Sequence, residues 1–259
     1  MMMTTPALRV TLLLTAVAVH AAADPALGQG VTEVPLQARG GRMVVPVRAA
    51  DGTELRFLVT TGSAVTVLSE SAAAKVGDQA LTLGGLPVDM EGSQTIPDAS
   101  LTVDGVAMDG LVSNNTLNDY DVLFDVPGRR LLLKPFGKKV EWPGMKLSDP
   151  VRLRVYHGVV LALDVEVDGK PYPAMLELGS PSLLVNQAVL DENGITDGKA
   201  DLRLGGTLFP SLPIRVSDNP IIARFSPGGD GFVLVGAAPA ADCAIAVSWV
   251  HREMRTCVR

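Results

Sequence analysis

The chain has 259 residues and a formal net charge of −6; 47% of its residues are hydrophobic and 19% are charged. This composition excludes general disorder, and no basic cluster is dense enough for a nucleic-acid-binding surface, so nucleic acid is not an expected partner. The length allows one large domain or two domains of roughly 110–120 residues.

The first 23 residues have the pattern of a secretory signal peptide. Arg9 is the only charge before Asp24, an apolar run occupies residues 10–19, and three alanines at 21–23 suit a cleavage site. The run is too short to span a bilayer comfortably. We therefore predict an exported protein, periplasmic or secreted, that keeps no transmembrane segment once residues 1–23 are removed. An uncleaved N-terminal anchor is the alternative.

The chain beyond the signal peptide has the pattern of short strands joined by turns. Asp51-Gly52 predicts a hairpin turn, and an apolar strand at residues 57–59 runs into the turn Gly62-Ser63. A closing hairpin is expected over residues 121–133. Turns this frequent are typical of a β-sandwich or barrel.

The same elements recur later in the chain. An offset of 117 residues aligns Asp51-Gly52 with Asp168-Gly169, and Gly62-Ser63 with Gly179-Ser180. Each copy then contains one predicted short helix, over residues 70–76 with Ser69 as N-cap, and over residues 187–193 with Asn186 as N-cap. An ordered series of matches at one offset indicates an internal duplication.

The duplication predicts two tandem lobes. The first covers residues 31–136 and the second residues 151–259, each a closed or partly open β-barrel with one short helix. Residues 137–150 between them are rich in Pro, Gly and Lys, which suits an exposed linker.

The two cysteines, Cys243 and Cys257, flank a segment that can form a hairpin centred near Val250. In that register they lie opposite one another, and an exported protein favours a disulfide between them. Their spacing does not match a zinc site or a redox motif. The sequence therefore predicts a structural disulfide.

The residues Val59-Thr60-Thr61-Gly62-Ser63, an apolar strand ending in a small-residue turn, resemble the retropepsin-like aspartic proteases. In that family the turn reads Asp-Thr-Gly-Ser or Asp-Thr-Gly-Ala. The resemblance extends to the Asp-Gly hairpin before the turn and to the closing hairpin. It implies that two fused copies form a pepsin-like, two-lobed arrangement in which both turns meet in a cleft.

The turns depart from the family at the residues that carry its chemistry. The family's aspartate falls on Thr60 in the first copy and on Glu177 in the second, and its threonine is Thr61 in the first but Leu178 in the second. The shared glycines and serines are Gly62, Gly179, Ser63 and Ser180.

The family's reaction needs two carboxylates that share one proton, one acting as general base and the other as acid. Thr60 supplies no carboxylate, and the longer Glu177 pushes its own into the space for water or substrate. Leu178 lacks the hydroxyl that, in the family, bonds across the two turns. The resemblance therefore implies a degenerate site with no intact catalytic residue.

Other candidate residues favour ordinary structural roles. Glu177 is either a lone base or a carboxylate in a partly wet cleft, and Ser63 and Ser180 are expected to bond turn backbone rather than to act as nucleophiles. Asp164, Glu166 and Asp168 alternate along one strand and indicate a solvated sheet face. We predict no metal and no cofactor.

Three functions follow as hypotheses. The first is a non-catalytic, exported protein that binds a peptide or protein segment in the cleft between the lobes. The second is an active peptidase or other hydrolase that uses Glu177. The third is an envelope scaffold with no ligand in the cleft.

Overall fold

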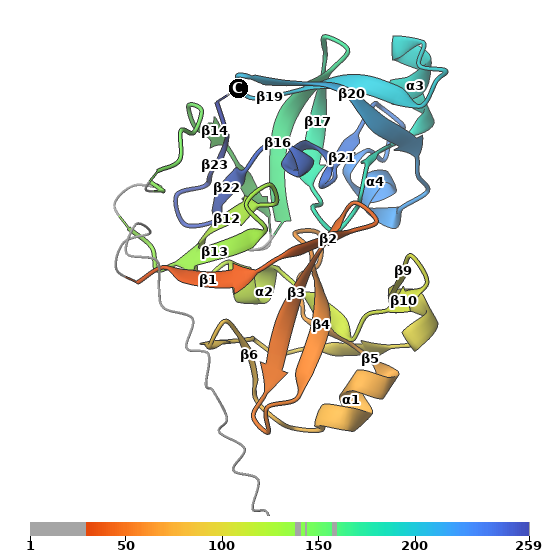
Figure 1. Ribbon diagram of the computed structural model, residues 1–259. Helices are drawn as coiled ribbons and strands as arrows, with labels where there is room; N and C mark the ends of the chain where they lie inside the picture. The colour runs from red at the N-terminus through yellow and green to blue at the C-terminus, as the bar shows by residue number, and fades with distance from the viewer. Residues whose placement is uncertain (1–29, 138–140, 143, 157–159, 259) are drawn as a thin grey trace, which may run out of the picture.

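The computed structural model describes residues 30–137, 141–142, 144–156 and 160–258. The predicted signal peptide, residues 1–23, lies outside them. The described chain is mainly β, as the sequence predicts (Figure 1). Within it, no helix combines the length and the apolar character needed to cross a bilayer.

The strands of the first part of the chain are β1 (Thr32–Pro35), β2 (Gln37–Arg39), β3 (Arg42–Ala49), β4 (Glu54–Val59), β5 (Val67–Ser69), β6 (Leu81–Leu83), β7 (Leu86–Pro87), β8 (Gln94–Ile96), β9 (Thr102–Val103), β10 (Val106–Ala107), β11 (Gly110–Val112), β12 (Asp121–Asp125) and β13 (Arg130–Lys134). Those of the second part are β14 (Val151–Arg152), β15 (Arg154–Tyr156), β16 (Val160–Val167), β17 (Lys170–Leu176), β18 (Leu183–Val185), β19 (Lys199–Leu204), β20 (Thr207–Val216), β21 (Val233–Val235), β22 (Ile245–Ser248) and β23 (Glu253–Thr256). The helices are α1 (Glu70–Val76), α2 (Asn114–Leu117), α3 (Gln187–Asn193) and α4 (Pro220–Phe225), with 3-10 turns η2 (Asp98–Leu101) and η3 (Ala238–Ala241).

The sheet of the first part is open at both edges. Its strands follow the order β7-β6-β3-β4-β11-β5-β8, and β2 pairs with β3. Strand β4 alternates exposed Glu54 and Arg56 with buried Leu55 and Phe57, which is the period of two expected of a half-buried strand. Strand β4 forms an antiparallel hairpin with β3 and also pairs in parallel with β11.

The sheet of the second part repeats these pairings and closes. The hairpin β16–β17, the parallel pair β17–β21, the antiparallel pair β21–β18 and the parallel pair β18–β20 correspond in order to β3–β4, β4–β11, β11–β5 and β5–β8. A further pairing of β16 with β19 closes six of the strands into a barrel. The predicted β-barrel is therefore present, closed in one part of the chain and half-open in the other.

A third sheet contains strands from both parts. Its order is β1-β13-β12-β22-β23-β14, so the two predicted closing hairpins lie side by side at its centre (Figure 1). Asp121 pairs with Ser248, and Phe124 with Ile245. We call this six-stranded sheet the shared sheet. The lobe boundaries at 31–136 and 151–259 stay a prediction.

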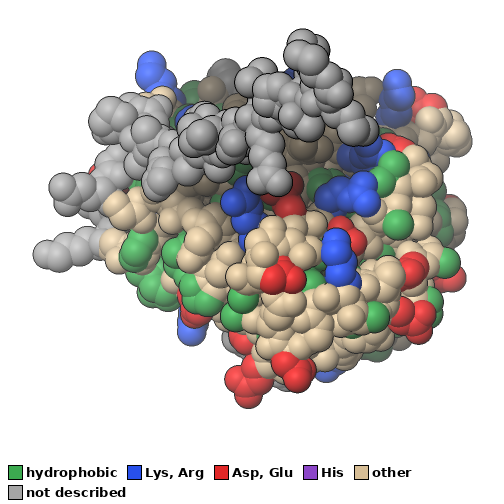
Figure 2. All heavy atoms as spheres, turned by 60° about the horizontal axis from the view of Figure 1, so that its bottom comes forward, with side chains coloured by type: hydrophobic (Ala, Val, Ile, Leu, Met, Phe, Trp, Pro, Cys, Tyr) green, Lys and Arg blue, Asp and Glu red, His purple; other side chains and the backbone are tan. Residues whose placement is uncertain are grey.

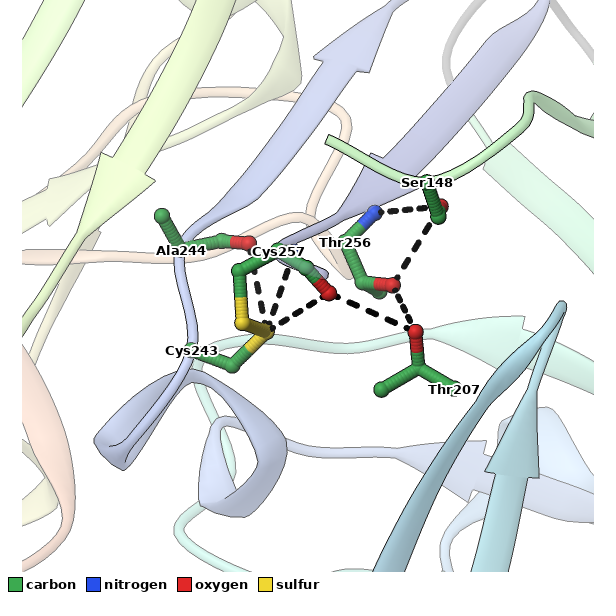
Figure 3. The surroundings of a disulfide bond; sticks show 6 residues. All are labelled: Ser148, Thr207, Cys243, Ala244, Thr256 and Cys257. Atoms are coloured by element: carbon green, nitrogen blue, oxygen red, sulfur yellow. Dashed lines mark hydrogen bonds between the residues drawn. A yellow bond between two sulfur atoms is a disulfide. The ribbon is translucent and has the colours of Figure 1, made fainter. Parts of the chain in front are cut away.

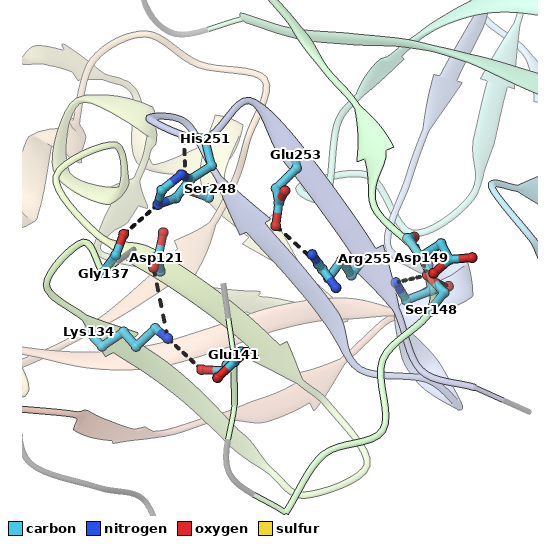
Figure 4. Close-up of polar contacts among 11 residues, drawn as sticks. Asp121, Lys134, Gly137, Glu141, Ser148, Asp149, Ser248, His251, Glu253 and Arg255 are labelled. Atoms are coloured by element: carbon cyan, nitrogen blue, oxygen red, sulfur yellow. Dashed lines mark hydrogen bonds and ion pairs between the residues drawn. The ribbon is translucent and has the colours of Figure 1, made fainter. Parts of the chain in front are cut away.

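Most of the described residues within 137–150 are exposed, and Trp142 packs on the shared sheet. Trp142 is buried against Leu123 and Ala246, and the Lys134 ammonium lies 4.8 Å from the centre of its ring. Lys134 also donates a hydrogen bond to the carbonyl oxygen of Glu141 (Figure 4). A buried indole explains why the segment lies against the sheet.

Local predictions hold where a turn or cap depends on adjacent residues. Asp168 and Gly169 have φ of 48° and 81°, as a two-residue hairpin turn requires. The Ser69 hydroxyl accepts a hydrogen bond from the backbone N–H of Ala72 and caps α1, at 3.2 Å.

Two helix predictions are corrected. Asn186 does not cap α3: its amide donates to the Asp230 carbonyl at 2.6 Å and accepts from the Phe232 N–H at 3.2 Å, because it is held by a distant loop. One short helix per lobe is also too few, since α2 and α4 are additional.

The predicted disulfide joins Cys243 to Cys257, whose Cα atoms are 5.4 Å apart (Figure 3). The hairpin register differs by one position from the expectation. Ile245 pairs with Thr256, and the N–H of Cys257 donates to the Ala244 carbonyl at 3.0 Å, so Cys257 lies beside Ala244 rather than directly opposite Cys243. The Thr256 hydroxyl bonds Thr207 of β20 at 2.7 Å.

Replacing both cysteines, Cys243→Ser with Cys257→Ser, is expected to lower the free energy of unfolding by about 2–4 kcal/mol, because the closed loop no longer restricts the unfolded chain. Thermal unfolding followed by circular dichroism measures the change, with the parent under reducing conditions as a control. An unfolding midpoint equal to that of the oxidised parent would show that the bond contributes nothing.

Charge on the molecular surface is mixed. On the face shown in Figure 2, acidic side chains are scattered over the lower part and several basic side chains lie nearer the middle. Hydrophobic side chains occur between them in small groups. The net charge of −6 is therefore not gathered in one patch on this face.

Candidate functional site

Two equivalent strands end at the candidate site. Thr60 follows β4, and its N–H donates to the Val112 carbonyl of β11 at 3.0 Å; Glu177 follows β17, and its N–H donates to the Val235 carbonyl of β21 at 2.8 Å. Each turn thus continues a central strand and is fixed by the parallel strand beside it. The positions of Thr60 and Glu177 are therefore fixed by hydrogen bonds to neighbouring strands.

The structure brings Thr60 and Glu177 into direct contact. The Thr60 hydroxyl donates to Glu177 Oε1 at 2.8 Å, and the Gly179 N–H donates to the same oxygen at 3.0 Å. The Gly62 N–H in turn donates to the Thr60 hydroxyl at 3.1 Å. The two positions that the resemblance assigned to the catalytic aspartates therefore meet as a hydroxyl–carboxyl pair.

The glycines of both turns are required by this close approach. A Cβ atom added to Gly62 would lie 1.0 Å from Glu177 Oε2, and one added to Gly179 would lie 2.7 Å from both Glu177 Oε1 and the Thr60 hydroxyl. The Glu177 carboxyl thus fills the space beside Gly62 on the opposite turn. That this is the space for water or substrate stays a prediction.

Thr61 ties the two turns together from one side. Its hydroxyl is fully buried, donates to the Leu176 carbonyl at 2.9 Å and accepts from the Leu178 N–H at 3.0 Å. Leu178, the equivalent residue of the second turn, is fully buried. Its side chain has no polar atom, so it makes no hydrogen bond to the first turn. The Thr61 carbonyl accepts from the Asn114 amide at 2.7 Å.

The two serines bond their own turns. Ser63 donates to the Val65 carbonyl at 2.8 Å, and Ser180 donates to the Ser182 carbonyl at 3.1 Å. His251 bonds the Gly137 carbonyl at 2.7 Å on the shared sheet (Figure 4), and His157 lies outside the described residues. No described histidine therefore serves either serine as a base.

A pocket of about 350 Å³ opens above the turns. The residues that line it are Arg42, Leu58, Thr60, Gly62, Ser63, Ser100, Leu101, Thr102, Leu111, Glu177, Gly179, Asn219 and Ile221. They come from both parts of the chain. Sequence analysis missed Arg42, Leu101 and Ile221, and also Asn114.

One of these omissions had a detectable signal. Asn219-Pro220 combines an N-cap residue with proline at the first helical position, and the Asn219 side chain accepts from the Ile221 N–H at 3.0 Å. Reading that pair would have placed α4. The other wall residues approach the turns only through tertiary structure.

Burial raises the pKa of the Glu177 carboxyl above its ordinary value. The hydrogen bonds from Thr60 and Gly179 and the charge of Arg42 act in the opposite direction but do not offset it. Glu177 Oε1 receives both protein hydrogen bonds, and no described residue donates to Oε2. Oε2 is thus the oxygen left for a ligand in the pocket.

Asp164 and Glu166 of β16, and Asp168 in the turn that follows it, do not line this pocket. Asp164 forms an ion pair with Arg154 at 2.8 Å, Glu166 pairs with Arg203 at 3.2 Å, and Asp168 accepts from the Asp201 N–H at 2.8 Å. Within the part of the chain that the structure describes, no three potential metal ligands converge.

Glu177→Gln is expected to raise stability at neutral pH. Between the ordinary glutamate pKa near 4.5 and the raised pKa of Glu177, the folded protein holds a proton that the unfolded chain has lost, so the free energy of unfolding falls as pH rises through that window. Gln keeps the Oε1 acceptor and does not titrate. Unfolding midpoints from pH 4 to 8, with the exposed Glu91→Gln as control, should show a flatter profile for Glu177→Gln alone. An unchanged profile would contradict the assignment.

No protein-family model matches the chain, and no curated protein matches it significantly.

Proposed function

We propose that this is an exported, non-catalytic protein of the retropepsin-like type, in which two lobes arranged as in pepsin bind a peptide or protein segment between the two turns. The observation that carries the proposal is the 2.8 Å hydrogen bond from Thr60 to Glu177, both of which line the pocket. Where the family needs a pair of acids, this chain holds one acid and one alcohol.

The chemistry of the pocket argues against acid–base hydrolysis by a carboxyl pair. Glu177 is the one acidic residue among the described residues that line it. A threonine hydroxyl does not lose its proton at working pH, so no proton-sharing pair forms. The Glu177 carboxyl also occupies the space beside Gly62, between the turns.

The walls support binding of a chain segment. Leu58, Leu101 and Leu111 come from the first part of the chain and Ile221 from the second, so a ligand contacts both. Apolar walls around a few fixed polar groups are the usual composition of a ligand site. Export is supported by the leader pattern and by the Cys243–Cys257 bond, because disulfides persist in oxidising compartments.

Hydrolysis that uses Glu177 alone is the second candidate. A half-buried carboxyl with a raised pKa inside a pocket is a common feature of general acids and bases. Hydrolysis and peptide binding both assign the main role to the Glu177 side chain, so one experiment on this residue can distinguish them.

One experiment separates the two. The purified protein and Glu177→Gln are incubated with an unstructured protein between pH 3 and pH 8, and fragments are identified by mass spectrometry. We expect no cleavage by either protein and retention of extended peptides by the folded parent. Cleavage by the parent but not by Glu177→Gln would overturn the proposal in favour of hydrolysis, and failure to retain any peptide would favour a scaffold.

A further inference from the structure

The Glu177 carboxyl is satisfied by the protein on one side only. Oε1 accepts from the Thr60 hydroxyl and the Gly179 N–H, whereas no described residue donates to Oε2. No ion pair with Glu177 forms among the described residues either. The Glu177 side chain is half-buried and lines the pocket, so a cation or strong donor in the pocket can pair with the oxygen that the protein leaves unbonded.

The space around Oε2 is suited to a long side chain with a charged end. Leu58, Leu101, Leu111 and Ile221 form apolar walls, and the carboxyl lies at the turns beneath them. A lysine side chain has this division, an aliphatic stem with an ammonium that carries three donors. A volume of about 350 Å³ exceeds what one such side chain needs, so part of the ligand backbone can enter as well.

Arg42 is the one basic residue among the described residues that line the pocket. Its charge favours the ionised form of Glu177, although it forms no ion pair with it. Arg42 therefore competes weakly with an incoming cation. Arg42 could instead bind an acidic residue of the ligand, so the test compares lysine with glutamate.

We propose that the pocket selects a lysine side chain of the bound segment, with its ammonium on Glu177 Oε2 and its stem between the leucines and Ile221. This inference rests on the proposed function, because it names the residue that the binding site recognises. Burial, which raises the pKa of Glu177 in the free protein, is then offset by the ligand's charge.

The test uses three pools of capped nonapeptides that are mixed at eight positions and carry lysine, norleucine or glutamate at the centre. Norleucine keeps the stem and removes the ammonium. Peptides retained by the purified parent, by Glu177→Gln and by the exposed control Glu91→Gln are quantified by mass spectrometry. We expect the parent and Glu91→Gln to prefer the lysine pool over norleucine by at least about tenfold, and Glu177→Gln to lose that preference while still retaining peptides.

Each other outcome has a distinct meaning. Equal retention of the lysine and norleucine pools by the parent overturns this inference and leaves the proposed function standing. Preference for the glutamate pool assigns recognition to Arg42 and also overturns it. Retention of no pool by the folded parent overturns the proposed function itself. The comparison on the parent decides the matter even where Glu177→Gln does not fold.

Discussion

Gly62→Ala is expected to destabilise the protein by about 3 kcal/mol, because the new methyl group would lie 1.0 Å from Glu177 Oε2. Gly62 does not have a positive φ, so the backbone itself accepts alanine and the cost comes from the Glu177 side chain. The free energy of unfolding measured in denaturant reports the loss directly.

A double-mutant cycle isolates that contact. Gly62→Ala made in a Glu177→Ala background should cost less than about 1 kcal/mol, because the carboxyl that blocks the methyl group is gone. Gly206→Ala is the matched control, since a Cβ there meets nothing within 4 Å and its φ is not positive. Equal costs for Gly62→Ala in both backgrounds would show that the Glu177 carboxyl does not lie against Gly62.

Thr61→Val is expected to lower the free energy of unfolding by about 2–4 kcal/mol. The change preserves the shape of the side chain but leaves the Leu178 N–H and the Leu176 carbonyl without their buried partner. For a chain of this size the unfolding midpoint should fall by about 5–15 °C.

The control for Thr61→Val is Thr95→Val, an exposed threonine on β8. It should change stability by less than about 0.5 kcal/mol. A loss for Thr61→Val no larger than that of the control would mean that the hydroxyl does not hold the turns together.

Much of the fold was predictable because its signals are local. Asp168-Gly169 fixes a two-residue turn by its own φ angles, and the helix α1 is bounded by Ser69 and Gly77, which are its neighbours in sequence. The closing hairpins followed from the same kind of pattern. The register at the cysteines was one position off because apolar residues there are continuous and do not mark which face each strand presents.

The candidate site was predictable only in part. The resemblance implied that the turns around Thr60 and Glu177 meet, but it did not predict the hydrogen bond between their side chains. Asn186 shows the same limit, since its best partners lie in the Asp230 loop and outcompete the adjacent helix. The pocket walls, Arg42 and Ile221 among them, meet only after both parts have folded.

The shared sheet has a consequence for the order in which the protein can fold. Strand β12 pairs on one side with β13 and on the other with β22, which lies near the end of the chain. During synthesis at roughly 5–20 residues per second, the edge of β12 waits on the order of ten seconds for that partner. Its residues Val122, Leu123 and Phe124 are fully buried in the finished protein. An unpaired apolar edge is prone to aggregate, so a nascent chain of this kind depends on being kept apart from others until its last hairpin emerges.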